Sequence, residues 1–243
     1  MKTHLSFAIV ILATLLLRGE PAQSQQASDA PPAGGPRIVA LGDSITKGVR
    51  PGVKSEETFA ALLQAELRKA NASAEVINVG IGGERTDQAL ARLAKDVIAL
   101  KPTMVTIMYG TNDSYVDPGK KDSRISPAEY RANLERLVAD LRAAGIVPVL
   151  MTEPRWGRTA KPNGVGEHPN VRLEKYVAAC RDVAKAKKVP LVDHFRVWNE
   201  RESKGADIGS WTTDQCHPNP DGHRLLMETM LPIVRAALPR PPR

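Results

Sequence analysis

The sequence RIVALGDSIT, residues 37–46, decides the fold because a short apolar run leads directly into a polar turn. Residues 37–41 are largely apolar and do not alternate strictly between apolar and polar types. Such a run is typical of a strand that is buried on both faces of a parallel sheet. The stretch therefore predicts a buried parallel strand that ends at a Gly-Asp-Ser sequence, residues 42–44.

Four further apolar runs predict four more strands, at residues 75–79, 104–108, 146–151 and 189–192. Apolar residues at helical spacing predict helices at residues 58–69, 86–100, 126–144, 171–187 and 221–237. The third helix opens with a capping box, Ser126 to Glu129, and Gly145 follows its last turn as a C-cap. Alternating strands and helices predict one α/β domain with a parallel sheet and right-handed crossovers.

Two features interrupt the alternation. Pro148 and Pro190 lack the N–H that a strand ladder needs, so we expect both at the starts of their strands. Residues 155–169 are rich in Gly, Pro and Asn, and they predict a long loop.

Three short motifs carry polar groups that could do chemistry. They are GDSI at residues 42–45, GTND at residues 110–113 and DQCHPN at residues 214–219. Open parallel sheets bind ligands beyond the carboxyl ends of their strands. Ser44, Gly83 and Asn112 each follow a predicted strand, so we expect them to gather at one edge of the sheet.

The residue types in these motifs are those that a serine hydrolase needs. A serine hydroxyl attacks well only when a base removes its proton, and His217 is a natural base for Ser44. Asp214 lies three residues before His217, where it could orient the imidazole and stabilise its charged form. The Ser44 N–H, the Gly83 N–H and the Asn112 side-chain amide could donate to the oxyanion that forms.

These blocks resemble the SGNH (GDSL-type) hydrolase family. The blocks are residues 42–46, 78–83, 110–113 and 214–218, and the resemblance covers residues 37–238. It implies a flavodoxin-like three-layer α/β/α fold with a five-stranded parallel sheet. It also implies ester hydrolysis through an acyl-enzyme without metal or organic cofactor, with Ser44, Asp214 and His217 as the triad and Ser44, Gly83 and Asn112 as the oxyanion hole. Isoleucine replaces the usual leucine at position 45.

Each motif also has a plainer interpretation. Ser44 could cap a helix, Asn112 could be a turn residue, and residues 217–220 could form a turn before the last helix. We expect Asp43 to support its loop by hydrogen bonding. We expect His168 and His194 to be surface or structural residues rather than metal ligands.

The N-terminal residues predict export. Residues 1–24 have a short basic start, an apolar run and small residues at cleavage spacing, as a secretory signal peptide has. An uncleaved anchor is the alternative. Residues 25–36 form a predicted disordered leader, and residues 37–243 form the predicted hydrolase domain. We therefore expect a periplasmic or secreted protein without stable membrane insertion after cleavage.

Charge and cysteine content bear on two further questions, nucleic-acid binding and disulfide formation. The formal net charge is +7, but the basic residues are scattered among 27 acidic ones and aromatic residues make up only 4%. We therefore expect no nucleic-acid partner. Cys180 and Cys216 could pair in an oxidising compartment, although sequence alone does not establish the geometry.

The substrate is the least determined feature. The family resemblance implies a lipase, lysophospholipase, thioesterase or carbohydrate O-acetylesterase. Arg85, Trp156 and Trp211 lie in polar candidate pocket loops, where the tryptophans could stack on sugar rings or simply pack the loops. We expect a short-chain esterase that removes acetyl groups from a carbohydrate. A lysophospholipase or broad arylesterase, and a non-catalytic carbohydrate-binding protein, are the alternatives.

Overall fold

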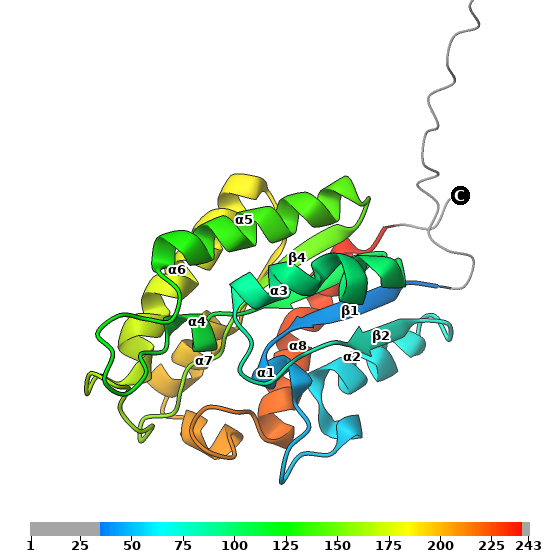
Figure 1. The fold of residues 1–243 in the computed structure, drawn as a ribbon. Coiled ribbons are helices and arrows are strands. Elements are labelled where there is room, and N and C mark those ends of the chain that lie inside the picture. The colour runs from blue at the N-terminus through cyan, green and yellow to red at the C-terminus, as the bar shows by residue number, and fades with distance from the viewer. Residues whose placement is uncertain (1–34, 240–243) are drawn as a thin grey trace, which may run out of the picture.

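Five parallel strands form one sheet in the order β2-β1-β3-β4-β5 (Figure 1). The structure is a computed structural model, and it describes residues 35–239. The strands are β1 (Arg37–Gly42), β2 (Glu75–Asn78), β3 (Met104–Met108), β4 (Val147–Thr152) and β5 (Leu191–Asp193). All five predicted strands are therefore confirmed, with ends that move by one or two residues.

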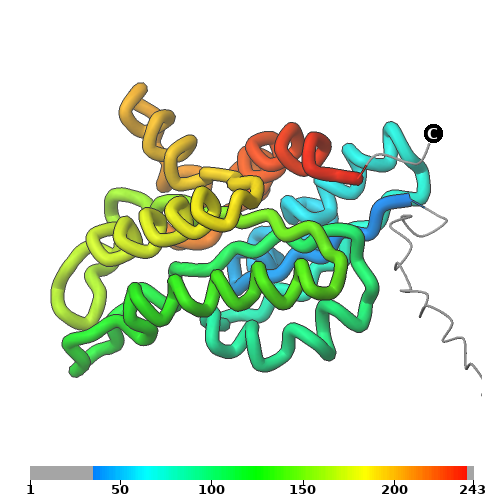
Figure 2. The backbone as a smooth tube through the Cα atoms, turned by 90° about the horizontal axis from the view of Figure 1, so that it is seen from above, coloured from blue at the N-terminus to red at the C-terminus, as the bar shows by residue number. Residues whose placement is uncertain are grey.

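Helices cover both faces of the sheet. Side chains alternate along β1, so that Val39 and Leu41 enter one buried cluster while Ile38 and Ala40 enter the other. The first cluster lies under α3 (Thr86–Arg92), α5 (Pro127–Ala143) and α6 (Pro169–Lys187). The second lies under α2 (Phe59–Arg68), α7 (His194–Ser203) and α8 (Pro220–Ala237). The predicted three-layer α/β/α sandwich is confirmed, and α5 and α6 run side by side over one face (Figure 2).

The helix predictions need two corrections. The predicted helix at residues 86–100 is not continuous, because α3 passes into a π-helical turn at Leu93–Val97 and a 3-10 turn at Ile98–Leu100. Helix α7 was not predicted. It begins directly after β5, where the side chain of Asp193 accepts a hydrogen bond from the Arg196 N–H and caps it.

Further short helices also escaped prediction: α1 (Ser44–Lys47), α4 (Thr111–Ser114) and the 3-10 turns at Ser55–Glu57 and Ile208–Trp211.

The two prolines lie where no ladder bond is lost. Pro190 directly precedes β5, and Pro148 is the second residue of β4. The Val147 N–H points toward β3 and donates to the Thr103 carbonyl. The Leu150 N–H points toward β5 and donates to the Pro190 carbonyl. An N–H at position 148 would point in the same direction as that of Leu150, toward β5. Because β5 begins only beyond this point, the proline at position 148 removes no hydrogen bond between strands.

Local signals also set the ends of α5. The Ser126 hydroxyl accepts a hydrogen bond from the Glu129 N–H, and Pro127 is the first helical residue, as predicted. Gly145 directly follows the C-cap residue and has a φ of 73°. Glycine adopts this left-handed conformation readily, so it ends the helix as predicted. Between β4 and α6, residues 153–168 form the expected long loop.

The predicted signal peptide, residues 1–24, and nearly all of the predicted leader, residues 25–36, lie outside the described residues. Within residues 35–239, no helix is both long and apolar enough to cross a membrane.

Candidate active site

Ser44 lies at the carboxyl end of β1, as the first residue of α1. The preceding residue, Asp43, caps this short helix because its Oδ1 accepts a hydrogen bond from the Ile45 N–H at 2.8 Å. Asp43 is completely buried, whereas Ser44 is only partly buried. The turn therefore holds the Ser44 side chain at the accessible edge of the sheet.

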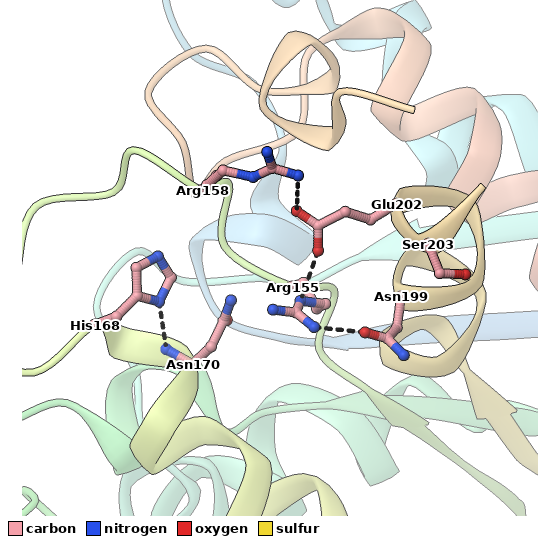
Figure 3. Close-up of a pocket in the computed structure, with 7 residues that line it drawn as sticks. All are labelled: Arg155, Arg158, His168, Asn170, Asn199, Glu202 and Ser203. Atoms are coloured by element: carbon pink, nitrogen blue, oxygen red, sulfur yellow. Dashed lines mark hydrogen bonds and ion pairs between the residues drawn. The ribbon is translucent and has the colours of Figure 1, made fainter. Parts of the chain in front are cut away.

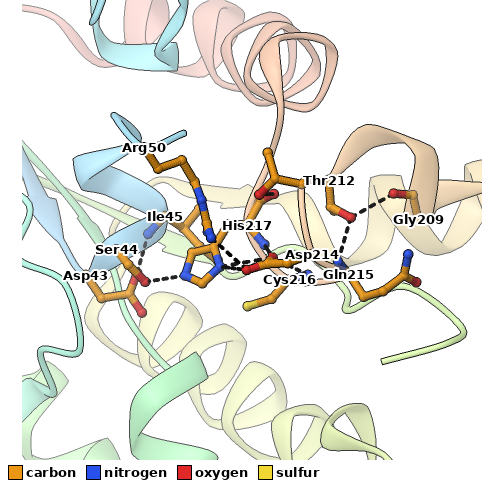
Figure 4. A network of polar contacts seen from close by, with 11 residues as sticks. Asp43, Ser44, Ile45, Arg50, Gly209, Thr212, Asp214, Gln215, Cys216 and His217 are labelled. Carbon is orange, nitrogen blue, oxygen red and sulfur yellow. Dashed lines mark hydrogen bonds and ion pairs between the residues drawn. The ribbon is translucent and has the colours of Figure 1, made fainter. Parts of the chain in front are cut away.

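Three of the predicted residues meet at this edge. The Ser44 Oγ lies 2.9 Å from the His217 Nε2, and the His217 Nδ1 lies 2.8 Å from the Asp214 Oδ2 (Figure 4). The His217 N–H also donates to the Asp214 Oδ1 at 2.9 Å, so the loop before α8 fixes both residues together. This arrangement allows His217 to accept a proton from Ser44 while Asp214 holds the imidazole in place.

Arg50 completes this line of polar groups, and sequence reasoning missed it. Its Nη2 donates to the Asp214 Oδ2 at 2.7 Å (Figure 4). Burial raises the pKa of Asp214, but the hydrogen bonds from His217, with a smaller effect of the Arg50 charge, lower it more, so its pKa lies below the usual range. Asp214 is therefore an anion near neutral pH.

The environment of His217 suits a base. Burial lowers the pKa of its imidazole, and the hydrogen bond to Asp214 acts in the opposite direction without cancelling the effect. The ring is therefore neutral at neutral pH, and its Nε2 is free to accept a proton.

The predicted oxyanion donors lie around Ser44. An added Cβ at Gly82 would lie 4.0 Å from the Ser44 Cβ, which places the loop of Gly83 beside the serine. Gly83 has a φ of 78°, and a Cβ there would meet nothing within 4 Å, so its backbone borders open space. Asn112 lies in α4, at the end of β3, and its Nδ2 donates to the Asp43 Oδ2 at 2.8 Å. Its second amide N–H remains for another acceptor.

Three carboxyl groups are buried behind these residues. They are Asp43, Asp113 and Glu153, each at most 1% exposed. Asp113 accepts a hydrogen bond from the Thr86 N–H at 3.0 Å, which ties the Asn112 turn to the start of α3. Burial raises the pKa of Asp43 to about 7 and that of Asp113 to about 6.

The three predicted substrate-binding residues have different surroundings. Arg85 binds Asp87 at 2.9 Å and lines a polar pocket of about 470 Å³ together with Asp117, Lys120, Lys121, Asp122, Ser123 and Arg124. Arg124 connects this pocket to the oxyanion residues, since its Nη1 donates to the Asn112 Oδ1 at 3.3 Å.

The two tryptophans also differ. Trp156 stacks on Tyr115 with 20° between the rings, and the Arg124 guanidinium lies 5.1 Å from the centre of the Tyr115 ring. Trp211 instead packs its ring edge-to-face on the buried Trp198, with 5.5 Å between ring centres. Both tryptophans are partly buried and pack against the core cluster under α8, and Trp156 packs against a second cluster around Phe195 as well. Trp156 differs in that it also lies in a row of side chains that leads to Asn112.

A second polar pocket lies between the 153–168 loop, the start of α6 and helix α7 (Figure 3). Its volume is about 470 Å³, and Arg155 and Arg158 both turn toward Glu202 there. The Gly157 N–H donates to the Gln215 carbonyl at 2.7 Å, so this loop is tied to the loop that carries His217.

The cysteines and the remaining histidines of the described part of the chain lie apart from one another in structural positions. Cys180 and Cys216 are buried as free thiols in separate clusters on opposite faces of the sheet. His194 is completely buried, and His168 caps α6 through the Asn170 N–H. No group of three or more His, Cys, Asp or Glu within residues 35–239 could hold a metal ion.

The sequence family follows from a comparison with known proteins. The model of the GDSL-like lipase/acylhydrolase family matches residues 40–225. The chain belongs to this family. It is 32% identical over 221 residues, 79% of this chain and 86% of the other, to the uncharacterized lipoprotein YqeF of Bacillus subtilis.

Two further comparisons point to the chemistry of this GDSL-like acylhydrolase. It is 30% identical over 212 residues, 81% of its length and 93% of the other, to an acetylxylan esterase of Geobacillus stearothermophilus. A crystal structure of an acetylxylan esterase from the same organism superposes with a TM-score of 0.68 at 27% identity, covering 82% of this chain and 94% of the other. The resemblance to SGNH hydrolases is therefore confirmed, and the chain is a carboxylic ester hydrolase.

Several residues of this acylhydrolase's site could not be found from its motifs. Arg50, Arg124 and Glu153 stand outside all the family blocks, and each reaches the site from a different loop. A single arginine or glutamate in a loop carries no spacing signal, so only the fold identifies them.

Proposed function

We propose that the protein hydrolyses carboxylic esters through an acyl-enzyme on Ser44. The observation that carries this proposal is the continuous line from the Ser44 Oγ to the His217 Nε2, 2.9 Å, and from the His217 Nδ1 to Asp214, 2.8 Å. A serine, a base and an orienting carboxylate at hydrogen-bond distance form the arrangement that activates a hydroxyl nucleophile.

The steps follow from these positions. His217 takes the Ser44 proton as the Oγ attacks the ester carbonyl, and Asp214 stabilises the imidazolium that forms. The Ser44 N–H, the Gly83 N–H and the free N–H of the Asn112 amide donate to the oxyanion. His217 then gives its proton to the leaving alcohol, which leaves the acyl group on the Ser44 Oγ. In the second half of the reaction, His217 takes a proton from a water that attacks the acyl group, and it returns that proton to the Ser44 Oγ as the carboxylic acid leaves. No step in this scheme requires a cofactor.

We further propose that the substrate is a short-chain ester, an acetyl group on a carbohydrate. The pocket beside Asn112 is lined by charged and polar side chains, including Arg85, which suits a sugar better than a fatty chain. Among the described residues, exposed large hydrophobic side chains are single and spread over the chain: Val49, Ile81, Val165 and Val171. A lipase would need a wider apolar surface. The similarity to an acetylxylan esterase supports the same substrate class.

Trp156 is the proposed stacking residue for a sugar ring, with Arg85 as a hydrogen-bond donor. Trp156 stacks on Tyr115 and packs against two buried clusters, but the residue is still partly exposed. Trp211 is a weaker candidate because it packs on Trp198.

We propose that the protein is exported to the periplasm or secreted, since residues 1–24 have the pattern of a signal peptide. A relative that is named as a lipoprotein supports export. The proposed partners are small-molecule or polysaccharide esters, with no nucleic acid and no stable insertion into a membrane.

Initial rates of residues 25–243 on p-nitrophenyl acetate, p-nitrophenyl octanoate and acetylated xylan test the proposal, with Ser44→Ala as the inactive control. We expect fast cleavage of both acetyl substrates and slow cleavage of octanoate. Preference for octanoate would favour a lysophospholipase or broad arylesterase instead. Binding of xylan without cleavage of any ester would favour a non-catalytic carbohydrate-binding protein.

A further inference from the structure

Two completely buried carboxyl groups face each other behind Ser44. Asp43 is the first residue after β1, and Glu153 is the first residue after β4, so both lie at the carboxyl edge of the sheet. Asp43 is 0% exposed and Glu153 is 1% exposed. Strand β3 lies between β1 and β4 in the sheet, so the Glu153 side chain must cross the end of β3 to reach Asp43.

The Glu153 side chain packs against Gly110, directly before α4. A Cβ at Gly110 would lie 3.6 Å from the Glu153 Cγ and 3.5 Å from the Tyr130 hydroxyl, which are ordinary contact distances. Glycine is favoured there because φ is 142°, which residues with a side chain rarely adopt. The Glu153 side chain thus lies against the start of the GTND motif, although it is far from that motif in the sequence.

The hydrogen bonds of the two acids are unequal. Both oxygens of Asp43 accept: Oδ1 from the Ile45 N–H at 2.8 Å, and Oδ2 from the Asn112 Nδ2 at 2.8 Å. Neither oxygen of Glu153 has a hydrogen-bond partner of good geometry among the described residues, and the nearby Thr111 N–H acts on the carboxyl only weakly. The side chain within its hydrogen-bonding reach is Asp43, which is itself only an acceptor while ionised.

Outside the pair itself, the charged group that acts most strongly on it is another acid, Asp113 of α4, which repels both carboxyl groups. Four neutral groups are buried nearby: the thiols of Cys180 and Cys216 and the phenols of Tyr109 and Tyr130. Two carboxylates in contact in an apolar interior cannot both be ionised, so one proton stays between them. Burial, together with the neighbouring Asp43 carboxyl, raises the pKa of Glu153 well above its usual range, and burial also raises the pKa of Asp43. The unequal hydrogen bonds place the proton on Glu153, because Asp43 already accepts from two donors.

We propose that Glu153 is a neutral carboxylic acid that donates its proton to Asp43, and that this Asp43–Glu153 pair positions Ser44 and Asn112 for catalysis. Asp43 then accepts three hydrogen bonds, from Ile45, Asn112 and Glu153. The Ile45 bond fixes the turn of Ser44, and the Asn112 bond aims the second amide N–H at the oxyanion. The positioning role rests on the proposed function of Ser44 and Asn112, whereas the protonation of Glu153 does not.

Infrared difference spectra test the protonation directly. A protonated carboxylic acid has a carbonyl stretch that a carboxylate lacks, and we expect one at pH 7 that is missing in Glu153→Gln. Asp193→Asn is the matched control, because Asp193 also lies at the carboxyl edge of the sheet, as the last residue of β5, but pairs with Arg181 and has a lowered pKa. That control should leave the band in place. Absence of the band from the wild-type protein at pH 7 would overturn the proposal.

Kinetics test the positioning role. Glu153→Gln keeps an N–H donor for Asp43, so kcat on p-nitrophenyl acetate should change at most a few fold. Glu153→Leu removes the donor, and kcat should fall by about 10- to 100-fold with little change in KM, less than the loss of an oxyanion donor itself. Unchanged kcat in Glu153→Leu would refute positioning.

The pH profile separates positioning from a merely structural role. Ionisation of Glu153 would place a second charge beside Asp43, so kcat of the wild-type protein should fall at alkaline pH. Glu153→Gln should lack this fall, and a fall that persists in the variant would contradict the proposal. If the wild-type protein cleaves no ester at all, the proposed function fails, while the infrared band still decides where the proton lies.

Discussion

Asn112 donates one N–H of its side-chain amide to the Asp43 Oδ2 at 2.8 Å. The proposed oxyanion donor after β3 is thereby anchored to the residue that precedes the proposed nucleophile after β1. Because Asp43 is completely buried and also caps α1, one carboxylate sets the positions of both groups. Two motifs that are 69 residues apart in sequence act as one unit for this reason.

Replacing Asn112 should remove catalysis without removing the base. For Asn112→Ala we expect kcat on p-nitrophenyl acetate to fall by roughly 10²–10³, the usual loss for one oxyanion donor. Asn71→Ala, in the exposed turn after α2, is the matched control and should keep full activity. A loss below about tenfold for Asn112→Ala would argue against its role in the oxyanion hole.

Replacing Ser44 or His217 should abolish most turnover. Both residues are needed to form the acyl-enzyme, so kcat should fall far more in Ser44→Ala and in His217→Ala than after the loss of one oxyanion donor. The double variant should have a kcat little lower than that of either single variant. Both side chains lie outside the core clusters, so melting temperatures should be unchanged. Residual activity of a tenth in Ser44→Ala would exclude it as the nucleophile.

The two cysteines should be free and unreactive in the native protein. Cys180 lies in the cluster under α6 and Cys216 in the cluster on the other face, so the sheet separates the thiols. A disulfide needs Cα atoms within about 7 Å and facing side chains. Thiol titration should therefore find two groups only after denaturation, and a reductant should not change the melting temperature. A count of zero thiols in denaturant would show that a disulfide forms.

The sequence was sufficient for the sheet and the main motifs because these depend on local pattern. The strands are short, largely apolar runs, and Ser44, Asn112 and His217 stand in short motifs that follow one another in a fixed order. Helix α7 escaped because it follows β5 without a turn, and its first residue, His194, gives no apolar signal although it is buried.

The residues around the motifs could not be predicted in the same way. Arg50 meets Asp214 across 164 positions, and Glu153 reaches Asp43 across the end of β3. Such contacts depend on the order of strands in the sheet, which alternation alone does not determine. Trp211 shows the opposite case, in which a residue expected to contact substrate from a polar loop instead packs on the buried Trp198.

Trp211 and Trp156 should therefore respond differently to truncation. Trp211→Ala should lower the free energy of unfolding by about 2 kcal/mol, less than for a fully buried tryptophan because Trp211 is partly exposed. Trp156→Ala should in addition raise KM for acetylated xylan, and it should also lower the unfolding midpoint in urea because Trp156 packs against two buried clusters. If Trp211→Ala raises KM and leaves stability intact, Trp211 contacts substrate and the packing interpretation is wrong.

The pH dependence of the reaction depends on His217 and its neighbours. Its pKa is lowered by burial, so the imidazole stays neutral, and therefore active as a base, to a pH below its ordinary value of 6.5. The acidic limb of kcat/KM, which reports the free enzyme, should lie below pH 6.5. A limb at or above that pH would show that burial does not dominate the titration of His217.

Arg50 makes this titration testable by substitution. Its positive charge opposes protonation of His217, and its hydrogen bond to Asp214 partly neutralises the carboxylate that stabilises the imidazolium. Arg50→Gln should therefore raise the pKa of His217. The acidic limb of kcat/KM should then move to higher pH, while the rate at the plateau changes less. Arg37→Gln is the matched control, because Arg37 pairs with Glu75 at the opposite end of β1 and should leave the limb in place. A shift of the limb to lower pH in Arg50→Gln would mean that Arg50 acts through the position of Asp214 rather than through its charge.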